Sequence, residues 1–477
     1  MSNRRLAFGT LAMGAANFLK IGIQLVMLPL MARLLGPSEY GLYSLAMPII
    51  MFIMMLADGG LGASLAREPE DNTDVWSSAF WALLISGLIM AGAVCASSYF
   101  LAAAAHEARL PAIMIALSPC LIMFVISVPG VARLTRQARL EVGAICDVVG
   151  NVAGAGCAIV LAIHGAGAWS LVAQTSVIYF VRALVFNVAA PMLPRFHLSL
   201  RDLAPHLMIG GTIIGGKLVD AADKSIENAF MGRNFGSGRL GAFSIANQIP
   251  AFLCGSVSNA LWAALYTQTI RTTDEEEVLR NYRNMIRIMA LLLFPMAALA
   301  AAEGQQLVAL LLGNRWGATS PMLEVFLITT TLSSTGILGQ AILVAKGKAS
   351  VLFRITAETA VMRVLVVCAS PWIGMDGLIA GLAASAIYTC WRSFATICRA
   401  MRISMASIMQ QMKWPALSSC LAGIACWLVS RHLTSGLLPV MLNLLAGSAC
   451  YFLLLLLFER RALFTDMGNV RRLLIRR

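Results

Sequence analysis

Residues His206 to Gly232 read HLMIGGTIIGGKLVDAADKSIENAFMG, a stretch long enough to cross a bilayer as one helix. It nevertheless contains five charged residues: Lys217, Asp220, Asp223, Lys224 and Glu227. At 100° per residue, four of them fall within about a quarter of the helix circumference, and Asp223 widens this arc only slightly. Charges of both signs at membrane depth are costly unless they face a watery cavity or paired partners. The stripe therefore indicates either a substrate path or an internal ion-pair cluster.

The composition outside this stretch is that of a polytopic membrane protein. Of the 477 residues, 59% are hydrophobic and only 12% are charged, whereas a soluble protein carries roughly 25% charged residues. The net charge of +13 does not indicate nucleic-acid binding, because the basic residues flank apolar segments in the way that orients membrane helices. The 11 cysteines lie in apolar runs without a C-x-x-C motif, so we expect no metal site and no resident cofactor.

Apolar windows bounded by Gly, Pro or charge predict an all-α protein with about 14 transmembrane helices. The windows are 9–32, 41–65, 76–101, 110–133, 141–163, 166–190, 206–231, 240–266, 286–312, 321–345, 351–370, 375–398, 413–431 and 437–458. If the N-terminus is cytoplasmic, roughly 25 lysines and arginines fall on the cytoplasmic side and about six on the other. We therefore expect both termini to be cytoplasmic.

An internal repeat gives the second organising feature. The segments MARLLG at 31–36 and GLYSLA at 41–46 are matched, 200 residues later, by MGRNFG at 231–236 and GAFSIA at 241–246. Six helices separate the two copies, so the repeats have the same orientation in the membrane. This predicts two pseudo-symmetric six-helix lobes around a central cavity, with two further helices at the C-terminal end.

The predicted organisation has five parts. They are an N-terminal lobe (1–190), a cytoplasmic interlobe linker (191–205), a C-terminal lobe (206–402), two additional helices (403–458) and a basic cytoplasmic tail (459–477).

The run RLLGPSEYGLYSLAMPIIMFIMMLADGGLGASLARE, from Arg33 to Glu68, resembles the most recognisable segment of the bacterial polysaccharide flippases, the Wzx-like branch of the MOP exporter superfamily. Asp223-Lys224 and the segment 231–246 resemble the counterpart in the second half of that family. The resemblance implies a flippase of the inner membrane. Such a protein moves undecaprenyl-diphosphate-linked oligosaccharide to the outer leaflet by alternating access, for O-antigen, exopolysaccharide or capsule synthesis. It also implies the lipid-linked oligosaccharide and the bilayer as partners.

Four cations inside the predicted helices are candidates for holding the diphosphate: Lys20, Lys217, Lys224 and Arg363. Each also has a structural interpretation. Lys20 is either a ligand or a member of an internal ion pair, and Lys217 and Lys224 can pair with Asp220 at helical spacing. Arg182 lies near a helix end, where its side chain can reach the interface.

Four acids are candidates for balancing these cations or for coupling transport to H⁺ or Na⁺: Asp58, Asp220, Asp223 and Glu227. Asp58 precedes Gly59-Gly60, so capping of a helix break is an alternative role. Glu324 and Glu358 are further acids inside predicted helices.

Three other functions stay open at this point. A drug or cation antiporter of the same superfamily would favour anionic residues in its cavity, whereas this chain supplies at least three cations. A membrane polymerase or glycosyltransferase would favour a large outward loop or an acidic metal site. A scaffold would not explain a charged membrane helix. We expect a transporter and not an enzyme, in the form of a monomer that could associate with polysaccharide polymerase or export machinery.

Overall fold

A computed structural model describes residues 3–68, 72–272, 274–432 and 436–475, and every regular element in these ranges is helical. Arg476 and Arg477 of the predicted basic tail lie outside the described residues. The chain forms two compact units, one up to Gly241 and the other from Ala242 onward. The five parts predicted above stay a prediction, since this division follows packing and not the repeat.

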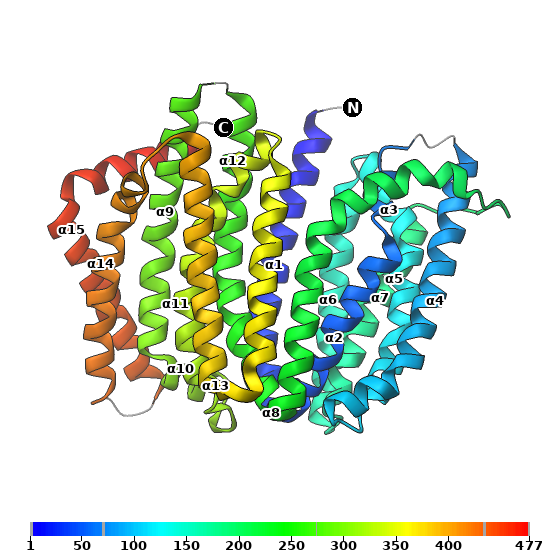
Figure 1. The fold of residues 1–477 in the computed structure, drawn as a ribbon, viewed down its shortest axis with the longest axis horizontal. Coiled ribbons are helices and arrows are strands. Elements are labelled where there is room, and N and C mark those ends of the chain that lie inside the picture. Colours follow the sequence, from blue (N-terminus) through cyan, green and yellow to red (C-terminus); the bar gives the residue numbers. More distant parts are fainter. Residues whose placement is uncertain (1–2, 69–71, 273, 433–435, 476–477) are drawn as a thin grey trace. The chain divides into compact units, whose positions relative to one another are not determined.

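The first unit consists of seven helices and the beginning of an eighth, and its long helices run in alternating directions (Figure 1). The elements are α1 (Asn3–Leu35), α2 (Pro37–Asp58), α3 (Leu61–Leu65), α4 (Thr73–Ala105), α5 (Leu110–Arg136), α6 (Leu140–Ile163), α7 (Trp169–Ala189) and the first part of α8 (Leu200–Arg271). Inside this unit α5 packs against α2, α4 and α7, and α6 packs against α1 and α7.

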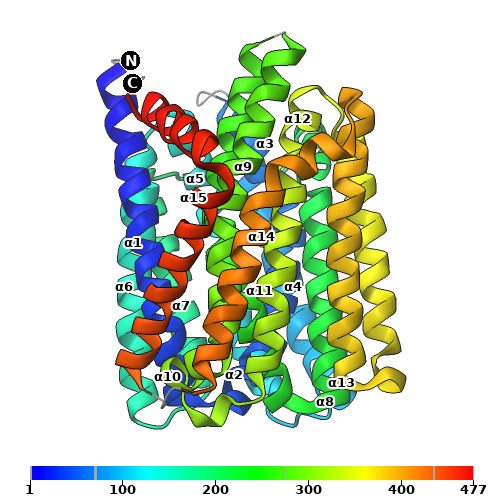
Figure 2. The ribbon, with the colours of Figure 1, turned by 90° about the vertical axis from the view of Figure 1, so that its left-hand side faces the viewer.

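The second unit begins with the remainder of α8. It continues with α9 (Glu275–Ala302), α10 (Gly304–Leu311), a 3₁₀ turn η1 (Asn314–Trp316), α11 (Thr319–Leu338), α12 (Gln340–Ala345), α13 (Ala349–Met401), α14 (Met405–Ser430) and α15 (Leu437–Ile475). Its largest apolar core joins α9, α11, α12, α13 and α14 around buried side chains such as Tyr282, Leu293 and Phe394. Along one side, α15 lies beside α14 (Figure 2).

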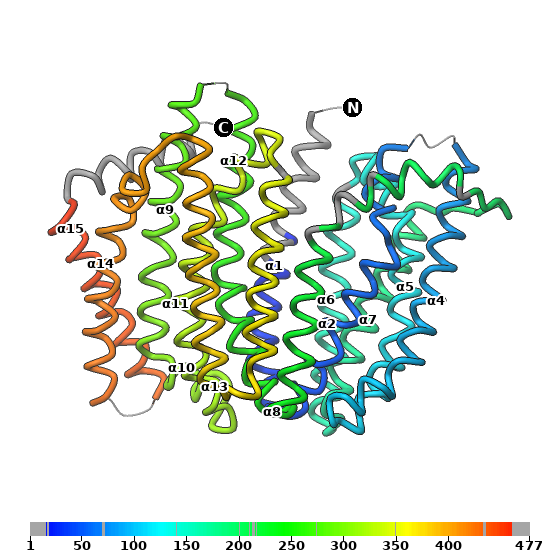
Figure 3. Tube along the Cα trace, viewed as in Figure 1, coloured from blue at the N-terminus to red at the C-terminus, as the bar shows by residue number. Residues whose placement is uncertain are grey.

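All fourteen predicted windows fall in helical segments, and ten described stretches are long and apolar enough to cross a membrane by length and composition. Two pairs of windows are joined into single elements. In α8 the chain reverses at Gly236 (φ 80°, ψ 165°), and in α13 at Gly374 (φ 69°, ψ −174°), because only glycine adopts such dihedrals without strain. Figure 3 lets the reader follow the reversal of α8 along the chain trace.

Two predicted boundaries are wrong. The window 286–312 is α9 and α10, which meet at Glu303, and α9 begins 11 residues earlier than predicted, at Glu275. Arg287, at the start of the predicted window 286–312, is buried within α9, where its guanidinium forms a two-point ion pair with Glu459 at 2.5 and 3.2 Å. The pair occurs where α15 bends, at the non-helical dihedrals of Glu459. Arg287 thus fixes α15 against α9 and does not contribute to membrane orientation as a loop charge.

The repeated loops contact each other reciprocally within the first unit. Gly36 and Gly236, which are equivalent in the repeat, have nearly identical dihedrals (φ 81°, ψ 171° and φ 80°, ψ 165°). A Cβ built on Gly41 would lie 2.8 Å from the amide nitrogen of Gly241, and one built on Gly241 would lie 3.0 Å from that of Gly41. Reciprocal contacts of this kind are the signature of a two-fold axis. The internal repeat is therefore present as local two-fold symmetry at this crossing.

The first part of α8 packs along α2 and α3. Near its start, Ser64 Oγ is 2.8 Å from His206 Nδ1, and Glu68 Oε2 is 3.4 Å from His206 Nε2. Two turns before the reversal, Asn228 Nδ2 donates a 2.7 Å hydrogen bond to the carbonyl oxygen of Ser44. The charged stretch 206–232 is thus held near both of its ends by polar contacts to other parts of the first unit.

Candidate functional site

Lys20 is paired inside the first unit. Its Nζ lies 3.2 Å from Asp147 Oδ2, which joins α1 to α6, and the two side chains are 35% and 43% exposed. A pair this accessible contributes little to stability, roughly 0–1 kcal/mol. The ammonium group has three donors, so Asp147 leaves capacity for a second anionic partner. The structure therefore brings Lys20 and an acid together in an accessible position, and the use of Lys20 for substrate stays a prediction.

The five charges of α8 separate into an exposed edge and a buried edge. Lys217, Asp220 and Lys224 are exposed, whereas Asp223 and Glu227 are 6% and 2% exposed. Asp220, Asp223 and Glu227 each take part in interactions. This order follows from helical geometry, since the two buried acids occupy one margin of the predicted arc and the two lysines the other. The stripe therefore presents its cations outward and turns two of its acids into the protein.

Asp58 is the last residue of α2 and lies at a break in the helix. Gly59 and Gly60, which follow it, both have left-handed dihedrals, and Asp58 Oδ1 accepts a 3.2 Å hydrogen bond from the Gly62 amide in the first turn of α3. This is the capping arrangement offered above as the alternative to a coupling role. Coupling through Asp58 stays a prediction.

Arg182 does not reach outward from its helix end. Its Nε donates a 3.0 Å hydrogen bond to Ser127 Oγ on α5, and its guanidinium lies 5.5 Å from the ring of Phe124 and 5.4 Å from that of Phe186. Cation–π contacts and a hydrogen bond stabilise a guanidinium where water is scarce. Arg182 thus links α7 to α5.

Arg363 lies in the first half of α13, is half-buried and takes part in interactions. In the same helix Glu358 accepts hydrogen bonds from Arg354 (2.8 Å) and from Arg392 in the second half of α13 (2.9 Å). Arg392, which lies in the predicted window 375–398, therefore links the second half of α13 to the first half. Glu358 is accordingly a structural partner of two arginines.

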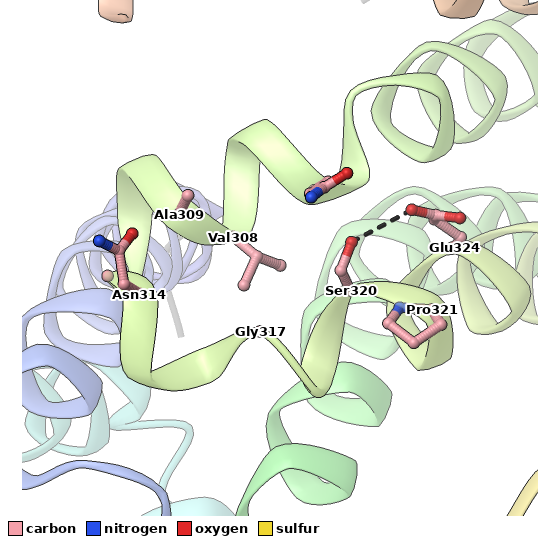
Figure 4. A pocket seen from close by; sticks show the side chains of 9 residues that line it. Val308, Ala309, Asn314, Gly317, Ser320, Pro321 and Glu324 are labelled. Atoms are coloured by element: carbon pink, nitrogen blue, oxygen red, sulfur yellow. Dashed lines mark hydrogen bonds between the residues drawn. The ribbon is translucent and has the colours of Figure 1, made fainter. Parts of the chain in front are cut away.

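Glu324 lines two cavities of the second unit. One, of about 440 Å³, lies between α10, η1 and the beginning of α11, and there Ser320 Oγ donates a 3.1 Å hydrogen bond to Glu324 Oε1 (Figure 4). The other, of about 490 Å³, is lined by apolar side chains of α9, α11 and α14 such as Phe294 and Trp427. Glu324 thus lies where a polar and an apolar cavity adjoin.

Three polar residues inside the helical units were missed by the sequence argument. Asp147 and Glu303 are acids within predicted helix windows, which is the same signal that identified Asp58, and Asn443 is an amide in the last window. A search for every ionisable residue inside an apolar window would have found the two acids. Their partners could not be found in this way, because they come from helices distant in the sequence.

Comparison with known proteins places the chain in a family. The family model described as "Polysaccharide biosynthesis protein" matches residues 30–321. Over 312 residues the chain is 25% identical to the succinoglycan biosynthesis transport protein ExoT of Rhizobium meliloti (strain 1021), and this match spans 65% of the chain but only 63% of that protein. Over 350 residues it is 23% identical to the lipopolysaccharide biosynthesis protein WzxC of Escherichia coli (strain K12), across 71% and 70% of the two chains.

Among solved structures, the lipid II flippase MurJ in an inward closed conformation has the same fold, with a TM-score of 0.79 over 94% of this chain and 99% of that one. The sequence identity to it is 10%, so this likeness concerns the fold alone. The predicted all-helical, multi-pass fold is confirmed by the structure and by this likeness. Since the family model matches more than half of the chain, this protein belongs to the polysaccharide biosynthesis protein family.

Proposed function

We propose that this protein is a flippase that moves undecaprenyl-diphosphate-linked oligosaccharide from the cytoplasmic to the outer leaflet of the bacterial inner membrane. The family, a relative that is a transport protein and a fold shared with a lipid flippase support this class of function. The translocated glycan would serve in the synthesis of a surface polysaccharide, whether O-antigen, exopolysaccharide or capsule.

The observation that carries the proposal is the outward position of the α8 cations. Lys217 and Lys224 are exposed on a membrane helix whose Asp223 and Glu227 are buried. A lysine at membrane depth is costly unless it meets water or an anion, and a diphosphate supplies such an anion as a compact double charge. In this proposal Lys20 contributes a further ammonium, released in part from Asp147 when the diphosphate arrives, and Arg363 contributes a guanidinium.

The charge distribution also supports an orientation. In the first unit, the helix ends on the side of the α1 N-terminus carry Arg67, Arg133, Arg136 and Arg139, and the opposite ends carry fewer arginines. Because basic residues are retained on the cytoplasmic side, we place both termini in the cytoplasm. Transport would proceed by alternating access. The chain would act as a monomer that could associate with a polysaccharide polymerase or with export machinery.

Coupling to H⁺ or Na⁺ belongs to the same proposal. The candidate groups are Asp220, Asp223 and Glu227 of α8, which neutralise the lysines of that helix in the absence of substrate, together with Asp58. In a drug or cation antiporter the acids would face the substrate. The burial of Asp223 and Glu227 favours the anionic substrate over this alternative.

The proposal is tested by replacing the cations in a strain that depends on this gene for surface polysaccharide. Lys20→Ala and Lys224→Ala, alone and together, should reduce surface glycan and leave lipid-linked oligosaccharide on the cytoplasmic face. Lys348→Ala is the matched control, because this lysine is exposed in the short turn before α13. Immunoblots of membrane fractions would establish that each variant is present at wild-type level.

Normal surface glycan in both single variants and in the double variant, at native expression, would contradict the assignment of the diphosphate to these lysines. An equal loss in Lys348→Ala would show that the effect is one of general charge. Accumulation of an unpolymerised or incomplete glycan without a change in sidedness would instead favour a polymerase or a glycosyltransferase.

A further inference from the structure

A buried carboxyl group lies at the junction of α9 and α10 in the second unit. Glu303 separates the two helices and is 1% exposed. Its Oε1 accepts hydrogen bonds from the Asn443 amide on α15 and from the Cys426 thiol on α14, the latter at 3.7 Å. Its Oε2 has no hydrogen-bond partner among the residues that the structure describes. Through Oε1 alone, the Glu303 carboxyl thus links the α9–α10 junction to both α14 and α15.

The surroundings of Glu303 are apolar and contain no cation that pairs with it in the described part of the chain. Asn443 Nδ2 also donates a 2.9 Å hydrogen bond to the Cys426 carbonyl oxygen, which fixes the amide between α14 and α15. Leu299 and Ala422 are buried in the same cluster, where α9, α14 and α15 meet. The group therefore has neutral donors on one side and hydrocarbon around it.

The other titratable groups near this junction do not supply a counter-charge. On α11, Glu324 is a second acid, and a Cβ built on Gly304 would lie 2.8 Å from its Oε1. On α15, Tyr451 uses its hydroxyl for a 3.1 Å hydrogen bond to the Leu291 carbonyl oxygen. On α14, Cys426 is a neutral donor, and Arg431, which directly follows that helix, stacks over the ring of Trp427 at 3.7 Å.

A carboxylate buried without a cation costs several kcal/mol, and proteins avoid this by binding a proton or a metal cation. We propose that Glu303 is a proton-binding site that carries a proton on Oε2, and that the neutral acid is the form that holds α14 and α15 against the α9–α10 junction. This site is distinct from the charges of α1 and α8, and the inference does not depend on the proposed transport activity.

The effect of burial on the pKa of the Glu303 carboxyl has the direction that a proton-binding site requires. Glu303 lies just beyond the spanning segment that ends at Ala302. Burial raises the pKa of its carboxyl, and the hydrogen bonds from Asn443 and Cys426 lower it by less. A group whose pKa is raised by folding contributes full stability at pH values below its unfolded pKa, and this contribution is lost as the pH rises through the folded pKa. The contact of α14 and α15 with α9 should therefore weaken toward alkaline pH.

The experiment uses the full-length chain, purified in detergent or nanodiscs, and compares the wild type with Glu303→Gln. Glutamine is a neutral isostere of the protonated acid, so the variant should fold and should lose the decrease in Tm that we expect of the wild type toward alkaline pH. Infrared difference spectra should show that the C=O stretch of a protonated carboxyl group is lost in this variant. Glu276→Gln is the matched control, since this acid also lies in the second unit, is exposed in the first turn of α9 and should leave that pH dependence in place.

Three results would overturn the inference. One is a Tm profile of Glu303→Gln that parallels the wild type at all pH values, with no carboxylic C=O band lost. Another is a rise in the Tm of the wild type, but not of the variant, on addition of Na⁺ at constant pH, because this would assign the site to sodium. The third is failure of both Glu303→Gln and Glu303→Met to fold, since a neutral side chain of this length should replace a neutral acid.

Discussion

The reciprocal contact of Gly41 and Gly241 makes the replacement of either glycine by alanine a sharp test of the fold. A Cβ on Gly41 would overlap the carbonyl oxygen of Ser237 and would lie 2.7 Å from its carbonyl carbon. Ordinary contact begins at 3.4 Å. The carbonyl carbon alone therefore requires the two backbones to separate by about 0.7 Å at a close-packed crossing, and the nearer carbonyl oxygen requires more. Overpacking typically costs about 1–3 kcal/mol. We expect the upper end of this range, since backbone and not a flexible side chain must move.

This destabilisation should be visible as a change in Tm. With the scaling for domains of 150–250 residues, 3 kcal/mol corresponds to a fall of roughly 6–12 °C. The assay is thermal unfolding of detergent-purified protein followed by size-exclusion chromatography. Because the contact is reciprocal, Gly41→Ala and Gly241→Ala should have similar effects. Gly238→Ala is the control, since it lies in the same turn, has no atom within 4 Å of its built Cβ and has no positive φ. Wild-type stability of both Gly41→Ala and Gly241→Ala would refute the crossing and the local two-fold axis.

Two further predictions concern buried and accessible ion pairs. Arg287→Met should destabilise the second unit by about 3–5 kcal/mol, because it leaves the Glu459 carboxylate without its cation in a largely buried position. The double variant Arg287→Met/Glu459→Gln should recover part of this loss. Equal thermal stability of the single and double variants would contradict the pairing. Asp147→Asn should release the Lys20 ammonium and so strengthen the binding of a polyprenyl diphosphate to the purified protein about fivefold, or ~1 kcal/mol. Lys20→Ala should weaken the same binding. If native mass spectrometry shows equal binding by the two variants, Lys20 is excluded as a ligand.

The helices were predictable from the sequence because a membrane imposes long apolar windows bounded by charge or glycine. The apolar windows could not predict where a helix breaks or changes direction within an apolar run. The break at Gly59-Gly60 had a local signal in its two glycines. The break at Glu303 had none, because Glu303 contacts residues of other helices, such as Asn443. The pairing of Arg287 with Glu459 was not predictable for the same reason, since a charge near a helix end is equally compatible with an exposed position and with a buried pair.

The repeat was the sequence feature with the most structural content. A match of a few residues at a spacing of 200 predicted two equivalent loops, and Gly36 and Gly236 have equivalent dihedrals. The contact between the two copies was not predictable, because a repeat gives the relation of two segments but not their distance. The pairs of charged residues were likewise only half predictable. Lys20 was identified as an ion-pair candidate, yet its pairing with Asp147, 127 residues away, could be identified only from the folded chain.

The α8 stripe has two edges that differ in exposure, and the two interpretations of the stripe, substrate path and internal ion-pair cluster, concern different edges. Asp223 and Glu227 are buried and engaged in interactions, so they fix the rotation of α8 about its axis. With that rotation fixed, Lys217 and Lys224 can only point outward. If Asp223 and Glu227 lay on the same side of α8 as Lys217 and Lys224, they would instead neutralise the exposed surface of the helix. The order of charges along the helix, and not their number, thus determines that α8 exposes both lysines and buries two of its acids.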